Sequence, residues 1–435
     1  AWTDRHLITN VDDAVWETAA AQTDSPLRVL ENKELGQRIQ KALDGLPAEY
    51  RLLLLLVAIV VASYTQQLRF GLVVTGMSDQ VSWAFYIGNF TFLVGVAAAA
   101  VMLVIPAYVY DWKPIKEIAI LGELLAISAL LMCQCFILAD VGRPDRLWHL
   151  VPFVGTMNFP RSLLAWDVLV LTTYLILNLF LVSYILYHDY TERSYDKRLF
   201  RFIVMLTIPA AVSIHTVTAY LYNGLAARPF WNSAILAPRF LSSAFCCGPA
   251  ILLILFQILR KTTKLEITNE AILKIAELMA YVMGFYLFMT AAEAFKEFYS
   301  DTEDVIFMRY LYIGLKGERT LVPFAWTSVL CGLVAFLLFV FPKTRKNMIT
   351  LNIGAVLIFI SVFVEKGMAL IIPGMTPDAL GEIYTYRPSL TEVSVGIGIL
   401  GLGFLVYTLL VKLAVPMLLG EFTINRVPFE ERITG

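Results

Sequence analysis

The chain has few charged residues. Only 16% of its 435 residues are Asp, Glu, Lys or Arg, against about a quarter in soluble domains. The 34 basic and 35 acidic residues nearly cancel, so no surplus positive charge is available to attract nucleic acid. These shortages exclude an ordinary soluble enzyme and a nucleic-acid-binding protein.

Cysteine and histidine are also scarce. None of the five cysteines forms a CxxC pair, and all five fall in apolar segments, so we interpret them as structural thiols rather than ligands of an iron–sulfur cluster. Of the four histidines, only His149 and His215 could form an axial haem pair, and they are expected at different depths of a bilayer. The sequence therefore predicts neither haem nor an iron–sulfur cluster bound by this chain.

Apolar residues are abundant instead, at 58% of the chain with a mean hydropathy of +0.70. Ten charge-free runs are close to the length of about 20 residues that crosses a bilayer, if one charge is allowed beside or within the shorter runs. The sequence predicts an all-α integral membrane protein with ten transmembrane helices. A polar tail over 1–50, an uncleaved first span, a membrane domain over 51–420 and a second tail over 421–435 complete the expected organisation. The ten runs are 52–68, 81–110, 124–139, 168–188, 202–227, 240–259, 278–292, 320–342, 347–364 and 393–411.

The basic residues predict an orientation. Of the 34 Lys and Arg residues, 22 fall on the side of the termini and 12 on the other side, which predicts cytoplasmic termini in a prokaryotic cell membrane. The outer connections are longer and rich in Pro, Trp and Tyr. Their arginines predict a bound partner or ligand, with ion pairing between the loops as the alternative. These outer connections are 140–161, 224–239, 296–319 and 373–391.

Ionisable residues inside predicted spans are costly and mark candidate functional sites. Asp167 and His215 lie toward the outer ends of their spans, and His149 lies at the membrane edge. A carboxylate with one or two histidines beside an apolar slot suits a quinone site, because such groups can accept the protons that a quinol releases. The alternatives are an ion pair of Asp167 with Arg161 or Arg143, and a core histidine bonded to a neighbouring helix.

Four further ionisable groups fall within spans: Glu123 near an inner end, and Glu293, Glu365 and Lys366 in outer thirds. Glu365 and Lys366 are adjacent, so their side chains do not face each other on a helix. Glu293 and Glu392 are candidate partners for Lys366. The group is expected to form either a structural network or part of a proton route.

Three sequence blocks, read together, resemble the NrfD/polysulfide-reductase family of membrane subunits. In the Trp-Asp-Val and Ala-Arg-Pro-Phe-Trp details they are most similar to the branch found in Dsr membrane complexes (DsrP, also called HmeB). The resemblance covers about 50–420. The blocks are Asp140-Val-Gly-Arg-Pro-Asp-Arg-Leu-Trp-His-Leu150, Asn158-Phe-Pro-Arg-Ser-Leu-Leu-Ala-Trp-Asp-Val168, and Ser213-Ile-His-Thr-Val-Thr218 with Ala227-Arg-Pro-Phe-Trp-Asn232.

The resemblance implies a subunit that reacts with menaquinone or another quinone and has no redox metal of its own. It implies two four-helix bundles, spans 2–5 and 6–9, with flanking helices 1 and 10. It also implies a ferredoxin-like iron–sulfur subunit on the outer face, linked to sulfur or sulfite metabolism. In the Dsr branch a multihaem cytochrome c, a haem b membrane subunit and a cytoplasmic iron–sulfur subunit belong to the same complex.

The family's site residues fall on a small set of positions in this sequence. Its quinone-site histidine falls on His149, its acid on Asp167, and its helix-five histidine on His215. The same blocks place Trp166, Arg143 and Arg228 among the candidate quinone-binding residues.

Two rival functions remain open from the sequence. A secondary transporter, or a proton-translocating subunit without quinone chemistry, is compatible with ten spans and buried charges. Transporters usually contain broken helices in corresponding places of two repeats; Gly248-Pro249 in span six could be one such break, but spans one and two contain no Gly-Pro counterpart. A passive anchor for redox subunits is the third interpretation, and it would not need Asp167 and His215 inside the membrane.

Overall fold

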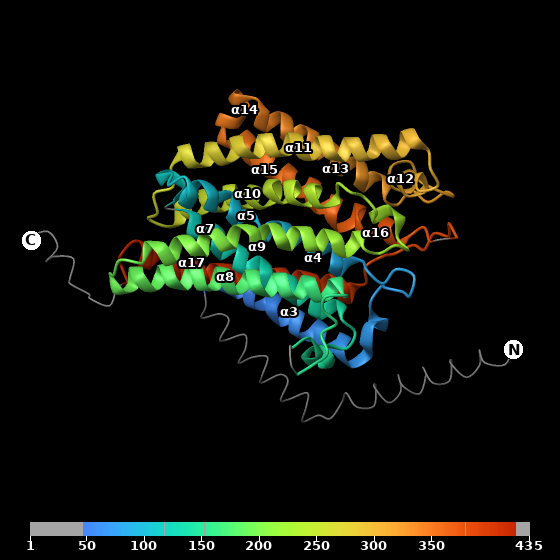
Figure 1. Ribbon diagram of the computed structural model, residues 1–435, viewed down its shortest axis with the longest axis horizontal. Helices are drawn as coiled ribbons and strands as arrows, with labels where there is room; N and C mark the ends of the chain where they lie inside the picture. The colour runs from blue at the N-terminus through green and yellow to red at the C-terminus, as the bar shows by residue number, and fades with distance from the viewer. Residues whose placement is uncertain (1–46, 117, 152–153, 379, 423–435) are drawn as a thin grey trace, which may run out of the picture. The chain divides into compact units, whose positions relative to one another are not determined.

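The computed structural model describes residues 47–116, 118–151, 154–378 and 380–422 (Figure 1). The chain divides into two units, 1–55 and 56–435, and the first lies almost entirely outside the described residues. Predictions about the two tails therefore lie outside the described residues as well. Within the described residues, the regular elements are helices, and ten of them are long and apolar enough to cross a membrane. The predicted all-α multi-pass fold and all ten predicted spans are confirmed.

The ten spans follow one another as antiparallel helices. Spans 2 and 9 each contain a π-helical segment. Span 1 continues into the 3-10 turn η1 (Gly71–Val74), and span 3 also includes the short helix α6 (Lys113–Lys116). Span 1 is α3 (Ala48–Phe70); spans 2–5 are α4 (Phe85–Ala97) with α5 (Ala99–Val104) and η2 (Ile105–Val109), α7 (Ala119–Asp140), α8 (Leu163–Thr191) and α9 (Lys197–Asn223); spans 6–9 are α10 (Leu236–Thr262), α11 (Asn269–Ser300), α13 (Val322–Val340) and α15 (Met348–Val364) with η5 (Glu365–Ala369) and α16 (Ile371–Met375); span 10 is α17 (Leu390–Leu418).

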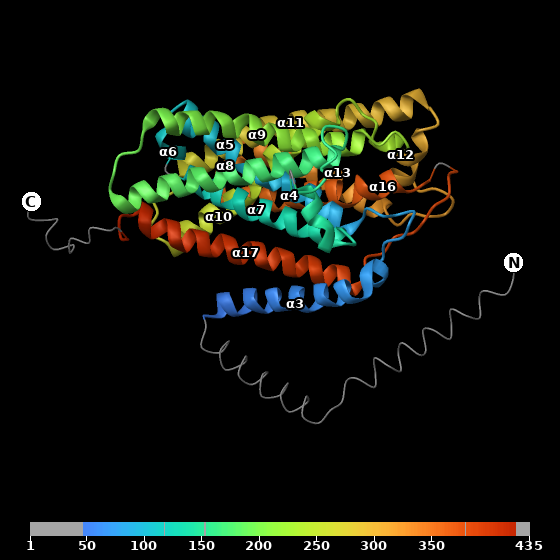
Figure 2. The same cartoon turned by 60° about the horizontal axis from the view of Figure 1, so that its bottom comes forward.

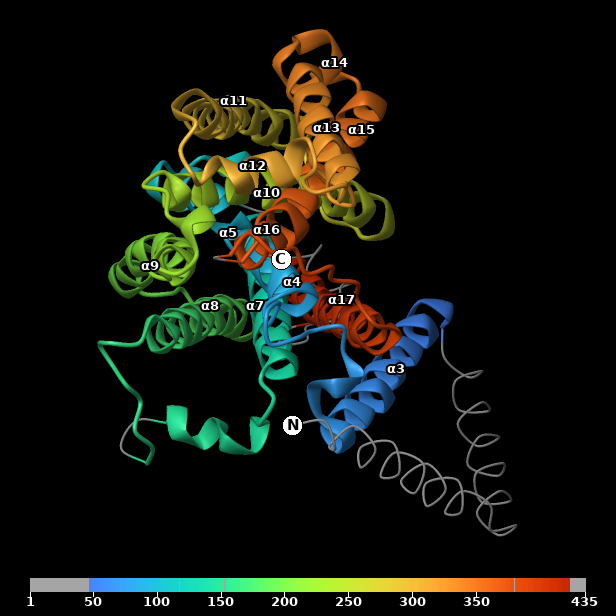
Figure 3. The same ribbon diagram turned by 90° about the vertical axis from the view of Figure 1, so that its right-hand side faces the viewer.

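Burial decides which spans form the centre of the second unit. In the apolar windows of spans 2 and 3, 78% of residues are buried, against 28% in span 8. Figure 3 shows α4 and α7 between α8 and α9 on one side and α10 on the other. Helices that are apolar all round suit this setting, because each of their faces meets either protein or lipid. Spans 2–5 and 6–9 thus form the two predicted bundles, which meet along α4 and α10.

Glycines allow the closest approaches between spans. A Cβ atom on Gly88 of α4 would lie 2.3 Å from the carbonyl oxygen of Gly367 in η5. On α17, a Cβ atom on Gly398 would lie 2.3 Å from the Cβ atom of Val60. Backbone contact at Gly88 therefore fixes the π segment of span 9 against span 2. The break considered at Gly248-Pro249 does not occur, because α10 is continuous there, and Gly248 instead makes room for Ala99.

The longer connections share one end of the spans, which we call the long-loop end. They carry four short elements, η1 (Gly71–Val74), η3 (Pro144–Leu150), η4 (Pro229–Trp231) and α12 (Val305–Tyr312). Figures 1 and 2 show α12 and α16 at this end, opposite α14 (Pro342–Lys346) and α6 (Lys113–Lys116). The side of the membrane that this end faces stays a prediction. The described residues that form the long-loop end are 71–84, 141–151, 154–162, 224–235, 301–321, 376–378 and 380–389.

Candidate functional site

Asp167 lies in the second turn of α8 and is only 2% exposed. Ser162 caps this helix by accepting a hydrogen bond from the backbone N–H of Ala165, which fixes the turn that carries the acid. The Oδ1 atom of Asp167 accepts a hydrogen bond of 2.7 Å from the hydroxyl of Thr218 on α9. A buried carboxyl with a neutral hydroxyl partner is suited to exchanging a proton rather than to holding a fixed ion pair.

The ion pair that the sequence left open for Asp167 does not form with Arg143. Arg143 donates to Asp145, two residues along its own loop, through Nε and Nη2 at 3.0 Å each. Arg161 is exposed, and no salt bridge joins it to Asp167 within the described residues. The ion pair considered for Asp167 is therefore not seen among the described residues, and its role in proton exchange stays a prediction.

His215 lies one turn before Thr218 on α9 and is fully buried. Neither of its ring nitrogens has a hydrogen-bond partner among the described residues. The alternative of a core histidine bonded to a neighbouring helix is therefore not supported. An unsatisfied buried polar group costs about 1–3 kcal/mol, so a histidine kept in this position is a candidate for binding or proton transfer.

His149 lies in a different environment from Asp167. It belongs to the 3-10 turn η3, is exposed, and stacks on Trp148 with 3.7 Å between the ring centroids. Thr218 on α9 contacts Asp167, whereas no hydrogen bond joins His215 or His149 to Asp167 in the described structure. The convergence of all three on one cavity stays a prediction.

An apolar pocket of about 530 Å³ separates η3 from α7 and α8, and we call it the α7–α8 pocket. Leu147 and Leu150, which flank His149, form part of its wall. Another part of the wall is formed by Val168, the residue after Asp167, and by Leu171, one helical turn after Asp167. The pocket therefore lies between the segment that carries His149 and the turn that carries Asp167. Its remaining lining residues are Leu131, Gln134, Cys135, Ile137, Leu138, Thr172 and Leu175.

The two other candidate quinone-binding residues bond to backbone carbonyls. Trp166 donates from Nε1 to the carbonyl of Pro160 at 2.9 Å, which ties α8 to the loop before it. Arg228 donates from Nη1 to the carbonyl of Met375 at 2.6 Å, which ties the connection before α10 to the end of span 9. Both side chains hold the long-loop end together.

The acids of the second bundle surround an arginine that the sequence analysis assigned to a loop. Arg239 lies in the first turn of α10 and is 8% exposed. It forms an ion pair with Glu293 and approaches Glu365, with 3.4 Å between Nη2 and Oε1. The sequence signal for this arginine was the presence of two acids, Glu293 and Glu365, in the outer thirds of their spans, because two buried carboxylates need a cation nearby.

Lys366 is a buried cation with an unusual set of neighbours. It is 1% exposed, donates to the carbonyl of Phe240 at 3.3 Å, and lies 4.6 Å from the centroid of that ring. Neither predicted partner pairs with it: Glu293 is paired with Arg239, and Glu392 caps α17. Both pairings were wrong because the π turn of η5 directs Lys366 toward α4 and α10.

Glu123 is the remaining candidate for a proton route. It lies on α7, is fully buried, and neither carboxyl oxygen has a hydrogen-bond partner among the described residues. Glu123 lies in the second turn of α7, and α7 reaches the long-loop end only at its last residue, Asp140. Asp167 lies in the second turn of α8, which begins at the long-loop end. The two acids therefore lie toward opposite ends of the spans. Glu123 therefore forms a buried polar position separate from the Asp167–Thr218 pair.

These features define a multi-pass helical membrane protein with buried ionisable groups in both of its bundles. The family model of polysulphide reductase, NrfD, matches residues 73–377, and the chain belongs to this family. It is 25% identical over 397 residues to a putative dimethyl sulfoxide reductase membrane subunit of Halobacterium salinarum, with 81% of this chain and 88% of that protein covered.

Two further relatives are similar over most of their length. A selenate reductase subunit of Mesobacillus selenatarsenatis is 22% identical, with 84% of this chain and 93% of that protein covered. An Hdr-like menaquinol oxidoreductase integral membrane subunit of Archaeoglobus fulgidus is 23% identical, with 86% and 95% covered. Membership confirms the family predicted from the three sequence blocks, while the Dsr branch stays a prediction.

Proposed function

We propose that this chain is the quinone-interacting membrane subunit of a multi-subunit redox complex. The observation that carries the proposal is the buried carboxyl of Asp167, which accepts a hydrogen bond from Thr218. Asp167 is not itself a lining residue, but the next residue, Val168, lines the apolar α7–α8 pocket. A relative whose name specifies a menaquinol oxidoreductase supports the quinone class. We therefore propose menaquinone as the quinone, with the site at the long-loop end of the first bundle.

The residues around the α7–α8 pocket fit an isoprenoid quinone. About 530 Å³ lined mainly by leucine, isoleucine and valine suits an apolar ring and the start of its tail. A bound quinol supplies two electrons and two protons, so the site must provide proton acceptors. Asp167 can accept a proton at its carboxylate while the Thr218 hydroxyl keeps the carboxylate oriented.

The histidines take different parts in this proposal. His215, one turn from Thr218, can take a proton onward because both of its ring nitrogens are without a protein partner among the described residues. His149 can reach the pocket only by a movement of η3, whose residues Leu147 and Leu150 already line it. We propose that η3 closes over the pocket and brings His149 to the second oxygen of the ring.

The electron partner is expected at the long-loop end. Trp148 and Val154 are 51% and 67% exposed there, beside the exposed Arg143–Asp145 pair. An aromatic and arginine-containing surface of this kind is typical of protein interfaces. We propose an iron–sulfur subunit on this surface, cytoplasmic termini, and a cell-membrane location; the other subunits of the Dsr branch and the link to sulfur metabolism remain predictions from the resemblance.

Proton movement through the membrane is a second candidate function. Glu123 and Lys366 are buried ionisable groups without an opposite charge in contact among the described residues, and such groups mark proton relays in membrane proteins. Neither residue lines the α7–α8 pocket, although Glu123 lies on α7. If they carry protons, loss of either group lowers proton translocation while quinol oxidation continues.

The test of the proposed quinone function is the Asp167→Asn variant of the assembled complex. Asn keeps the shape and can accept from Thr218, but it cannot accept a proton at neutral pH. Loss of a general base typically costs about 10²–10⁴-fold in rate, so quinol oxidation is expected to fall by that factor while the complex assembles. Asp189→Asn, at the opposite end of the same helix, is the matched control. Near-normal quinol oxidation by Asp167→Asn would contradict the proposal.

A further inference from the structure

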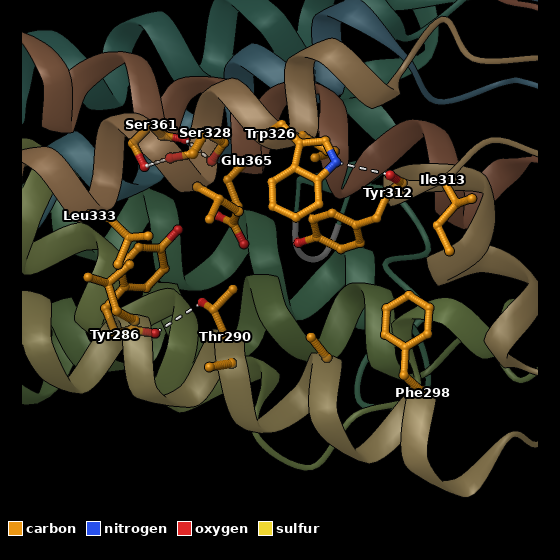
Figure 4. A pocket seen from close by; sticks show the side chains of 16 residues that line it. Tyr286, Thr290, Phe298, Tyr312, Ile313, Trp326, Ser328, Leu333, Ser361 and Glu365 are labelled. Carbon is orange, nitrogen blue, oxygen red and sulfur yellow. Dashed lines mark hydrogen bonds between the residues drawn. The ribbon is translucent and has the colours of Figure 1, made fainter.

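A second pocket, of about 430 Å³, lies between α11 and α13 in the other bundle, and we call it the α11–α13 pocket (Figure 4). It is lined mainly by apolar side chains from α11, α13 and η5. Several of its lining residues are exposed, among them Phe298 by 38%, Trp326 by 49% and Leu333 by 45%. These residues belong to membrane spans, so the pocket opens sideways toward lipid.

Most polar groups on the wall of this pocket are already bonded within the protein. Ser328 and Ser361 each donate to the backbone carbonyl of the other at 2.8 Å, which locks α13 to α15. Thr290 donates to the carbonyl of Tyr286 at 3.0 Å. Trp326 donates to the carbonyl of Tyr312 at 3.0 Å, so its indole is a fixed wall rather than a mobile side chain.

Three polar groups remain directed into the pocket. The hydroxyls of Tyr286 and Tyr312 point toward the carboxylate of Glu365 (Figure 4). Tyr286 is only 2% exposed, and neither hydroxyl forms a hydrogen bond within the described residues. Burial raises the pKa of Tyr312 above its ordinary value, so this hydroxyl stays protonated and can donate. The pocket thus offers two phenol groups and one carboxylate on its wall.

The charge around Glu365 selects the kind of ligand. Arg239 is shared between Glu293 and Glu365, so one cation faces two carboxylates and no positive charge is left over for a phosphate. None of the residues that line the pocket is a lysine or an arginine. A phospholipid headgroup is therefore disfavoured, whereas a neutral group with hydroxyl donors can bond to Glu365 and accept from a tyrosine.

We propose that the α11–α13 pocket is a second binding site for an isoprenoid quinol, separate from the α7–α8 pocket. A flat ring fits beside the fixed Trp326, its hydroxyls reach Glu365 and the two tyrosines, and its tail leaves through the lateral opening. The proposal concerns binding and not turnover. The ligand class follows from the pocket itself, so the proposal does not depend on Asp167 being the proton acceptor of the first site.

The test uses the purified complex and a photoreactive menaquinol analogue, with the labelled peptides identified by mass spectrometry. We expect label on α11 or α13 that unlabelled menaquinol removes and added phospholipid does not. Tyr286→Phe removes one hydroxyl and keeps the ring, so this label is expected to fall about three- to tenfold, the value of one hydrogen bond. Tyr281→Phe, on the same helix but 70% exposed and outside the pocket, is the matched control and keeps the label.

The outcomes separate the two sites. The Asp167→Asn complex is expected to keep the label on α11 and α13 even when its quinol oxidation is lost. Label removed by phospholipid but not by menaquinol would show a lipid site and overturn the proposal. Absence of label on both helices, or equal label in the Tyr286→Phe and wild-type complexes, would also overturn it. Normal quinol oxidation by Asp167→Asn would refute only the first site.

Discussion

Lys366 allows a sharp prediction, because a buried ammonium without a carboxylate partner is costly. Among the described residues, its ammonium group forms one hydrogen bond to the Phe240 carbonyl and one cation–π contact with the same ring. A hydrogen bond to a charged group contributes about 1.5–3 kcal/mol, and a desolvated cation–π contact about 2 kcal/mol. Against this gain stands a desolvation penalty of several kcal/mol per buried ion.

The perturbation is Lys366→Met, which removes the charge while a flexible apolar side chain fills the same space. We expect the complex to be as stable as the wild type or more stable, by up to about 4 kcal/mol, the range seen when buried ionic groups give way to apolar ones. Lys366→Ala removes the volume as well and is expected to cost about 2–5 kcal/mol through the cavity that it leaves.

The assay is thermal unfolding of the purified complex, wild type and both variants, in the same detergent. If Lys366→Met destabilises the complex as much as Lys366→Ala, the ammonium group is a structural element and the reasoning is refuted. If Lys366→Met is stable but impairs proton translocation, Lys366 is kept in the membrane for function at a cost in stability.

Three further changes have defined outcomes. Arg239→Gln leaves Glu293 and Glu365 without their cation, so we expect a loss of about 3–5 kcal/mol, measured as a lower unfolding temperature; an unchanged temperature would contradict the buried ion pair. Gly88→Ala places a Cβ atom 2.3 Å from a backbone carbonyl oxygen, so the yield of assembled complex should fall sharply, and normal yield would contradict the contact. Thr218→Val removes the hydroxyl that orients Asp167; quinol oxidation should fall less than in Asp167→Asn, and an equal loss would assign a direct role to Thr218.

The architecture could be predicted from the sequence because a bilayer imposes its own length and polarity on each helix. Every charge-free run corresponds to a span in the structure, since an apolar run of this length has few alternatives to a membrane helix. The same counting predicted that Asp167 and His215 lie inside their spans, and both side chains are buried there. The composite spans 2 and 9 were missed, because a π turn depends on tertiary packing such as the Gly88–Gly367 contact.

The partners of the buried charges could not be predicted in the same way. Arg239 ends a predicted loop in the sequence but lies inside the first turn of α10, where it faces acids from two other spans. Lys366 was expected beside a carboxylate, but the turn of η5 directs it to the Phe240 ring. Such pairings depend on helix rotation and on contacts between spans that are distant in sequence, which residue spacing does not encode.

The most direct test of the central claim is an electron cryo-microscopy map of the complex with a bound menaquinone analogue. We predict density for the ring in the α7–α8 pocket, between η3 and the turn of α8 that carries Asp167, with a ring oxygen in hydrogen-bond reach of that carboxyl. Clear density for the analogue elsewhere in the chain, with the α7–α8 pocket filled by side chains or lipid tails, would contradict it.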